Sequence, residues 1–143
     1  MYDYKHFTVA VDFDNTCVVA GKVYPEIAGS VPGAASELAK LASFGVRIVL
    51  WTCRVGKELD AARKWFEDNG IPLFGVNHNP DPYWIENPTR KIYADVYVDD
   101  KGLNMPTITI NHQNCVDWNE AGRMILEEHE RWYWRHFYRG GLR

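Results

Sequence analysis

The sequence predicts one α/β domain spanning residues 1–143, in which a mostly parallel central sheet is packed between layers of helices as a three-layer sandwich. Short apolar segments typical of buried strands alternate with amphipathic segments of helical period, and this alternation favours a parallel sheet. Of the 143 residues, 46% are hydrophobic and 24% are charged, so a core of ordinary size can form without disulfides. We find no internal repeat, low-complexity segment or linker that would divide the chain.

Five segments have the length and composition of strands. The first is rich in valine and aromatic residues, and the second is apolar on both faces, as expected for central strands of a parallel sheet. The fourth ends, like the first, in a pair of carboxylates. The predicted strands are residues 7–13, 46–52, 73–77, 92–100 and 106–111.

Three further segments carry apolar residues at helical spacing. Gly45, Gly70 and Gly140 follow their last turns, where glycine commonly ends a helix. The segments between these elements are rich in glycine or proline and are expected to be irregular. The predicted helices are residues 31–45, 56–70 and 117–138, and the predicted irregular segments are residues 17–31 and 77–90.

Polar side chains gather where three of the predicted strands end. Asp12 and Asp14 end the first strand, Thr52 ends the second, and Asp99 with Asp100 ends the fourth. In open parallel sheets, ligands bind outside the carboxyl ends of the strands. The sequence therefore predicts one site built from these residues at one edge of the sheet.

The residue types at this edge favour phosphoryl transfer. Carboxylates without a histidine or cysteine partner suit a hard cation, usually Mg²⁺. A hydroxyl such as that of Thr52 can donate to a phosphate oxygen, and Lys91 or Lys101 can neutralise its charge. One carboxylate could attack phosphorus to form an aspartyl-phosphate, while a second acts as general acid and then as base.

Four motifs in this order resemble the haloacid dehalogenase superfamily of phosphatases. They are VAVDFDNT at residues 9–16, RIVLWT at residues 47–52, the lysine of TRKIYADV at Lys91, and VYVDD at residues 96–100. The resemblance covers roughly the first hundred residues. It implies a Rossmann-like fold and a Mg²⁺-dependent phosphomonoester hydrolase.

The resemblance also implies a role for each motif residue. Asp12 would be the nucleophile, and Asp14 would be the acid and base, with its backbone carbonyl also contacting the metal. Thr52 and Lys91 would hold the transferring phosphoryl group. Asp99 would complete the Mg²⁺ site, with Asp100 supporting it directly or through water.

Two assignments have competing interpretations. Lys91 lies only eight residues before Asp99 and must reach the site from a loop, whereas Lys101 directly follows the acidic pair; we favour Lys91. Arg54, two residues after Thr52, is placed to bind a substrate phosphate or base. It could equally pair with an acid at the protein surface.

The chain resembles a member of the superfamily that lacks a cap domain. Neither connection near the site has the roughly 50 residues that a folded cap would need, although residues 17–31 could form a small flap. An open site suits a macromolecular phosphate end, including a polynucleotide end, or a small ester such as a nucleotide, with a neighbouring subunit as an alternative lid. Tyr83 and Trp84 could stack on a base, or pack their loop onto the domain.

The final helix ends in a basic aromatic segment, with four arginines and no acidic residue from residue 131 onward. The simplest expectation is a docking helix with Ile125, Trp132 and Phe137 facing inward. A homo-oligomer contact and a nucleic-acid contact are alternatives, because aromatic residues and arginine are frequent in both.

Composition predicts a cytoplasmic protein. The net charge of −3 gives no general case for binding nucleic acid or an acidic membrane. The three cysteines form no CxxC pair and have no zinc-binding spacing, which is typical of a reducing compartment. The N-terminal segment has neither a signal peptide nor a membrane-spanning run.

Two other functional classes share parts of this pattern. A receiver-like phospho-acceptor uses similar residues, but it would carry its acidic pair on the first strand and its acceptor on a middle strand, the reverse of the order here. A non-catalytic binding protein with a relict site would have lost key carboxylates, and none is missing. The sequence therefore favours the hydrolase.

Overall fold

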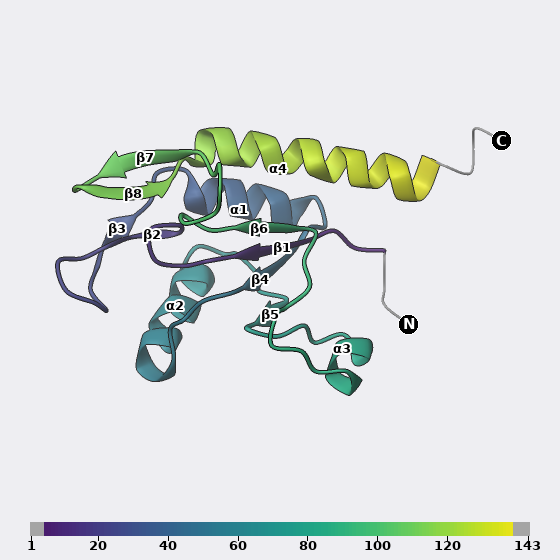
Figure 1. Ribbon diagram of the computed structural model, residues 1–143, viewed down its shortest axis with the longest axis horizontal. Helices are drawn as coiled ribbons and strands as arrows, with labels where there is room; N and C mark the ends of the chain where they lie inside the picture. The colour runs from purple at the N-terminus through teal and green to yellow at the C-terminus, as the bar shows by residue number, and fades with distance from the viewer. Residues whose placement is uncertain (1–4, 139–143) are drawn as a thin grey trace.

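The computed structural model describes residues 5–138, and its centre is a four-stranded sheet in which every paired strand is parallel. The strands lie in the order β5-β4-β1-β6, so the first strand is central (Figure 1). This confirms the predicted α/β fold, and no separate cap domain is present among the described residues. The strands are β1 (Thr8–Val11), β4 (Arg47–Leu50), β5 (Gly75–Val76) and β6 (Val96–Val98).

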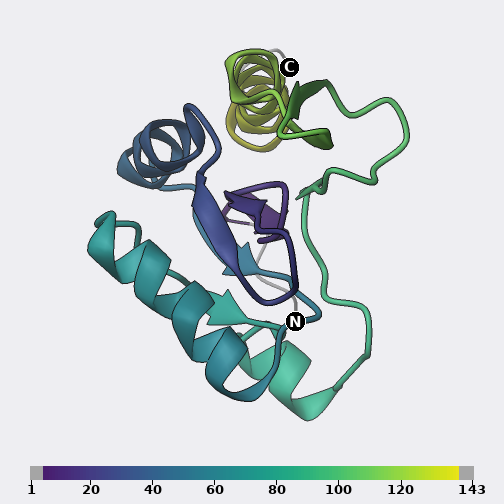
Figure 2. The ribbon, with the colours of Figure 1, turned by 90° about the vertical axis from the view of Figure 1, so that its left-hand side faces the viewer.

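The two faces of the sheet are covered unequally. Val9 and Val11 point toward the main core, where they join buried residues of the three longer helices. Ala10 and Val49 point to the opposite face and pack with Ile92 in a much smaller cluster. That face is covered by the segment before β6, which contains only the short helix α3 (Pro82–Glu86) (Figure 2). The longer helices are α1 (Ala34–Ser43), α2 (Gly56–Asp68) and α4 (Trp118–Tyr133).

Two β-hairpins lie beyond the carboxyl ends of the central strands (Figure 1). The first hairpin pairs β2 (Val18–Ala20) with β3 (Ile27–Ser30) and lies where the sequence predicted an irregular segment. All four residues of β3 are exposed, so this strand lacks the alternation of buried apolar and exposed polar residues that would predict it. We call residues 18–30 the flap. The second pairs β7 (Thr107–Ile110) with β8 (Gln113–Val116). The predicted fifth strand therefore exists, but it belongs to this hairpin and not to the central sheet.

The carboxyl-terminal helical segment changes its geometry after Tyr133. A π-helical turn, η1 (Trp134–Tyr138), continues it to the last described residue, while Gly140 lies outside the described residues. Trp132 is buried as predicted, but the prediction for Phe137 is wrong, because its side chain is 53% exposed. A π turn holds more residues than an α turn and so rotates the following side chains away from the helix face that packs inward.

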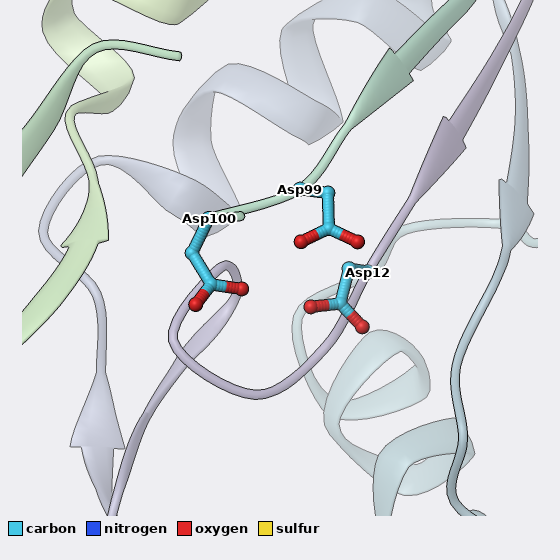
Figure 3. Close-up of side chains that lie close together, drawn as sticks. All are labelled: Asp12, Asp99 and Asp100. Atoms are coloured by element: carbon cyan, nitrogen blue, oxygen red, sulfur yellow. The ribbon is translucent and has the colours of Figure 1, made fainter. Parts of the chain in front are cut away.

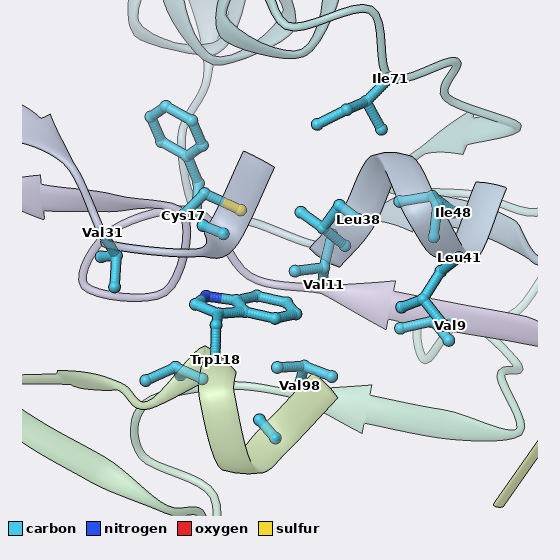
Figure 4. Packing of buried hydrophobic residues seen from close by; sticks show 14 of the residues in the cluster. Val9, Val11, Cys17, Val31, Leu38, Leu41, Ile48, Ile71, Val98 and Trp118 are labelled. Atoms are coloured by element: carbon cyan, nitrogen blue, oxygen red, sulfur yellow. The ribbon is translucent and has the colours of Figure 1, made fainter. Parts of the chain in front are cut away.

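Trp118, at the start of α4, joins this helix to the loop that follows β1. Its indole is buried among side chains of β1, α1 and β6, including Val11, Leu38 and Val98 (Figure 4). The indole Nε1 donates a hydrogen bond of 2.6 Å to the carbonyl oxygen of Thr16. The main core therefore reaches the polar edge of the sheet. Among residues 5–138, no helix is both long enough and apolar enough to cross a bilayer.

We expect the Trp118→Phe substitution to lower the free energy of unfolding by about 2 kcal/mol, because it removes the hydrogen bond to a buried carbonyl and leaves unfilled space. Urea denaturation would measure the change. Trp134→Phe is the matched control: this tryptophan is 51% exposed, and its substitution should change the stability by less than about 0.5 kcal/mol. Equal effects of the two substitutions would contradict the role assigned to Trp118.

Candidate active site

Strand register brings the predicted carboxylates together. Val11 of β1 pairs with Val98 of β6, so the next residues, Asp12 and Asp99, lie side by side at the ends of neighbouring strands. The backbone N–H of Asp12 donates to the carbonyl of Val98 at 2.9 Å. Asp12, Asp99 and Asp100 each offer a carboxylate oxygen, and these three atoms lie within 4.8 Å of one another (Figure 3). We call these three residues the carboxylate cluster.

Thr16 holds two members of the carboxylate cluster in place. Its hydroxyl oxygen lies 3.4 Å from a carboxylate oxygen of Asp12 and 3.4 Å from one of Asp100, and it accepts a hydrogen bond of 3.2 Å from the backbone N–H of Asp100. The residue is fully buried. The sequence reasoning gave Thr16 no role of its own, although its place at the end of the DxDxT motif was the available signal.

Asn15 links the loop after β1 to both hairpins. Its backbone is left-handed, with a φ of 57°, which asparagine tolerates better than most residues. Its side-chain amide donates to Gln113 at 2.9 Å and accepts from the backbone N–H of Ala20 at 3.0 Å. Gln113 in turn donates to the carbonyl of Ala20 at 2.8 Å. This three-way contact joins residues far apart in sequence and could not be expected from spacing.

Asp14 is not a member of the carboxylate cluster and pairs with an arginine instead. Its carboxylate accepts two hydrogen bonds from Arg54, at 2.8 Å from Nε and 2.7 Å from Nη2. Arg54 thus pairs with an acid, as one interpretation expected, but the arginine itself is buried and not at the surface: it is 1% exposed, and the side chain of Asp14 is 28% exposed. The substrate-binding role expected for Arg54, and the metal contact expected from the backbone carbonyl of Asp14, stay predictions.

Thr52 sits at the end of the neighbouring strand and is fixed from two sides. Its backbone N–H donates to the side chain of Asn77 at 2.8 Å, and its hydroxyl accepts from the backbone N–H of Arg54 at 3.1 Å. Asn77 follows β5 and has a φ of 56°. The ends of β4 and β5 therefore meet here, and the hydroxyl hydrogen of Thr52 can still be donated to a ligand.

The two candidate lysines occupy different surroundings. Lys91 lies on the segment that covers the smaller core cluster, with its Nζ 5.3 Å from the centre of the Tyr97 ring. Lys101 directly follows the carboxylate cluster, and its backbone N–H donates to Asp99 at 2.8 Å. Burial raises the pKa of Asp100, and the charge of Lys101 acts against this increase. The assignment of Lys91 as the phosphate ligand stays a prediction, and Lys101 is the lysine whose charge reaches the cluster.

The aromatic residues of α3 pack against their own domain. The ring of Trp84 stacks on Tyr93 with centroids 5.9 Å apart and planes 16° apart, and Tyr83 meets Trp84 edge-on at 4.9 Å. Figure 1 places α3 at the end of the sheet opposite the hairpins. Of the two interpretations of this segment, the contacts favour packing over stacking on a substrate base.

Comparison with solved structures identifies a relative of the chain. A conserved protein from Bacteroides thetaiotaomicron superposes with a TM-score of 0.69, over 86% of this chain and 92% of that protein, with 31% sequence identity. The chain belongs to the same family as this protein. No protein-family model and no curated protein sequence matches the chain. The relative shares the fold of this chain, and the carboxylate cluster is a candidate metal site of this chain.

Burial and like charge dominate the electrostatics of the site in this member of the family. Burial, with added repulsion from Asp99 and Asp100, raises the pKa of Asp12 to about 8, despite an opposing backbone hydrogen bond from Phe13. Burial is also the largest cause of a raised pKa at Asp100. Three close oxygen donors, with excess negative charge and no cysteine or histidine among them, fit a hard divalent cation such as Mg²⁺.

We expect the metal-free protein to lose stability as the pH rises from about 4 to about 8. Between the ordinary pKa of 3.8 and the raised pKa of about 8, the folded state holds a proton on Asp12 that the unfolded state has released, so the free energy of unfolding falls with pH. Urea denaturation in chelator across this range would measure the slope.

The Asp12→Asn variant isolates the contribution of this carboxyl group from those of other titrating groups. Its unfolding free energy should fall less steeply over the same range, and it should exceed that of the wild-type protein at pH 8. Added Mg²⁺ should stabilise the wild-type protein more at pH 8 than at pH 5.5, because the cation competes with the proton. Parallel pH slopes for the two proteins would contradict this account of the site.

Proposed function

We propose that the protein is a Mg²⁺-dependent phosphomonoester hydrolase of the haloacid dehalogenase type that works through an aspartyl-phosphate on Asp12. The observation that carries this proposal is the carboxylate cluster at the carboxyl edge of a parallel sheet. Asp14 lies two residues along the same loop but has a different partner, Arg54. Two neighbouring carboxylates in different surroundings can take different chemical roles.

Asp12 and Asp99 would hold the cation, with support from Asp100 and from the backbone carbonyl of Asp14. When bound, Mg²⁺ would offset the repulsion between the carboxylate cluster and a phosphate dianion and polarise the phosphoryl oxygens. Thr52 is placed to donate its hydroxyl hydrogen to one of these oxygens. Lys91, or Lys101 in its place, would supply a further positive charge.

In the first half of the reaction, a carboxylate oxygen of Asp12 forms a bond to phosphorus as the ester P–O bond breaks. The departing oxygen takes a proton from the carboxyl group of Asp14 and leaves as an alcohol. In the second half, a water oxygen attacks phosphorus and the bond to Asp12 breaks, which restores its carboxylate. Asp14 takes a proton from that water, so the net change is ester plus water to alcohol plus phosphate.

An open site supports two substrate classes. No separate cap domain is present among the described residues, so a large phosphorylated molecule could approach the site. We therefore propose a phosphomonoester that is either a macromolecular end, such as a polynucleotide terminus, or a nucleotide-sized ester. The order of the motifs disfavours a receiver-like phospho-acceptor, and the intact carboxylates disfavour a non-catalytic binding protein.

The proposal predicts that the protein releases phosphate from a generic aryl phosphate in Mg²⁺ and that excess chelator stops the release. The Asp12→Asn variant should show no turnover above background, because the nucleophile is lost. The Asp14→Asn variant should lose about 100-fold or more in kcat, the usual contribution of a general acid and base. Steady-state phosphate release would measure all three effects.

Asp60→Asn serves as the matched control, because Asp60 is an exposed acidic residue on α2. This variant should keep the wild-type rate. Metal-independent turnover, or equal rates for Asp12→Asn and Asp60→Asn, would sink the proposed mechanism. If the protein hydrolyses no generic ester, the next measurement is metal-dependent binding of beryllium fluoride, a phosphate mimic. Absence of this binding would rule out the proposed aspartyl-phosphate chemistry.

A further inference from the structure

We propose that Arg54 is a positioning residue that holds Asp14 and the tip of the flap together as one unit, and that it does not bind the substrate phosphate. This inference rests on the proposed hydrolase function, in which Asp14 is the acid and base. It replaces the simplest expectation for an arginine near a phosphate site, which is direct contact with phosphate oxygens.

Almost every donor of Arg54 already has a protein partner. Nε and Nη2 donate to the two carboxylate oxygens of Asp14. Nη2 also donates to the carbonyl of Pro25 at 3.0 Å, and Nη1 donates to the carbonyl of Glu58 at 3.3 Å. A guanidinium has five N–H donors, so these four contacts leave one. Bidentate hydrogen bonding to a phosphate would require Arg54 to break hydrogen bonds that it makes to the protein.

Arg54 also lies between the interior and the flap. Its guanidinium carbon is 5.0 Å from the centre of the buried Phe13 ring and 5.3 Å from the centre of the Tyr24 ring, which is 63% exposed. Tyr24 and Pro25 form the tip of the flap, whose strands close through a hydrogen bond of 2.7 Å from Gly21 to Glu26. One buried side chain therefore contacts both the flap tip and the carboxylate of Asp14.

The shape of the guanidinium explains why an arginine is suited to this position. Its planar fork fixes both oxygens of Asp14 at once, and its remaining edges reach two backbone carbonyls from different segments. A lysine offers a compact charge that cannot make this set of contacts. Movement of the flap tip and reorientation of Asp14 are therefore coupled through Arg54.

The first test uses the leaving group of the substrate, with the Arg54→Lys and Arg54→Gln variants. A 4-nitrophenyl phosphate needs little help from a general acid, whereas an alkyl phosphate depends on it. If Arg54 positions Asp14, kcat for the alkyl ester should fall at least about tenfold more than kcat for the nitrophenyl ester. The KM values, and inhibition by inorganic phosphate, should change less than about twofold.

Equal losses for both esters, with inhibition by inorganic phosphate weakened about tenfold or more, would overturn the proposal and make Arg54 a phosphate ligand. Thermal unfolding of each variant checks that the fold is intact. If the wild-type protein hydrolyses neither ester, metal-dependent binding of beryllium fluoride decides whether the proposed function fails, and this outcome is distinct from equal losses in an active enzyme.

The second test measures amide hydrogen exchange in the flap. It does not depend on the arginine variants, so it remains usable if they fold poorly. Tyr24→Ala removes the ring beside Arg54 but leaves the ion pair with Asp14 in place. It should speed exchange in residues 21–28 and lower kcat for the alkyl ester about threefold or more. Val23→Ala is the matched control, because Val23 is a neighbouring flap residue that is 66% exposed. If Tyr24→Ala behaves like Val23→Ala in both measurements, the coupling does not exist.

Discussion

The parallel register of β1 against β6 is the constraint on which the site depends. It places Asp12 and Asp99 at adjacent strand ends, where two like charges meet in a half-buried position. Burial and repulsion together raise the pKa of Asp12 to about 8. Such an arrangement is costly unless protons, hydrogen bonds or a cation offset it. The same strand register therefore concentrates negative charge at the end of the sheet, and the proposed metal ion would neutralise it.

Rigid supports surround this costly arrangement. Trp118 extends from the core to the carbonyl of Thr16, whose hydroxyl contacts both Asp12 and Asp100. Asn15, the preceding residue, ties the same loop to both hairpins. The loop after β1 is therefore fixed both by apolar packing against the core and by hydrogen bonds to the two hairpins. Sites in which supporting residues lock the side chains in this way hold their geometry closely enough for chemistry.

Two carboxylates that are close in sequence have distinct surroundings. Asp12 faces other carboxylates, whereas Asp14 is paired with the buried guanidinium of Arg54. This asymmetry supports a division of labour between a nucleophile and a proton-transfer group. It also ties the second role to the flap, because Arg54 contacts the backbone of Pro25. A site without a cap domain among the described residues can thus still be linked to the flap through a single side chain.

The sequence by itself determined the α/β class, the strand ends and the meeting of Asp12 with Asp99, because hydrophobic period and the geometry of parallel sheets are local rules with predictable consequences. It did not reveal the flap hairpin, the separate β7–β8 pair or the exposure of Phe137, since short exposed strands and a π turn leave weak patterns. The contacts of Asn15 with Gln113, and of Arg54 with Asp14 and Pro25, were decided only by the tertiary structure. Such contacts join residues that are distant along the chain, and their partners depend on how all the elements pack.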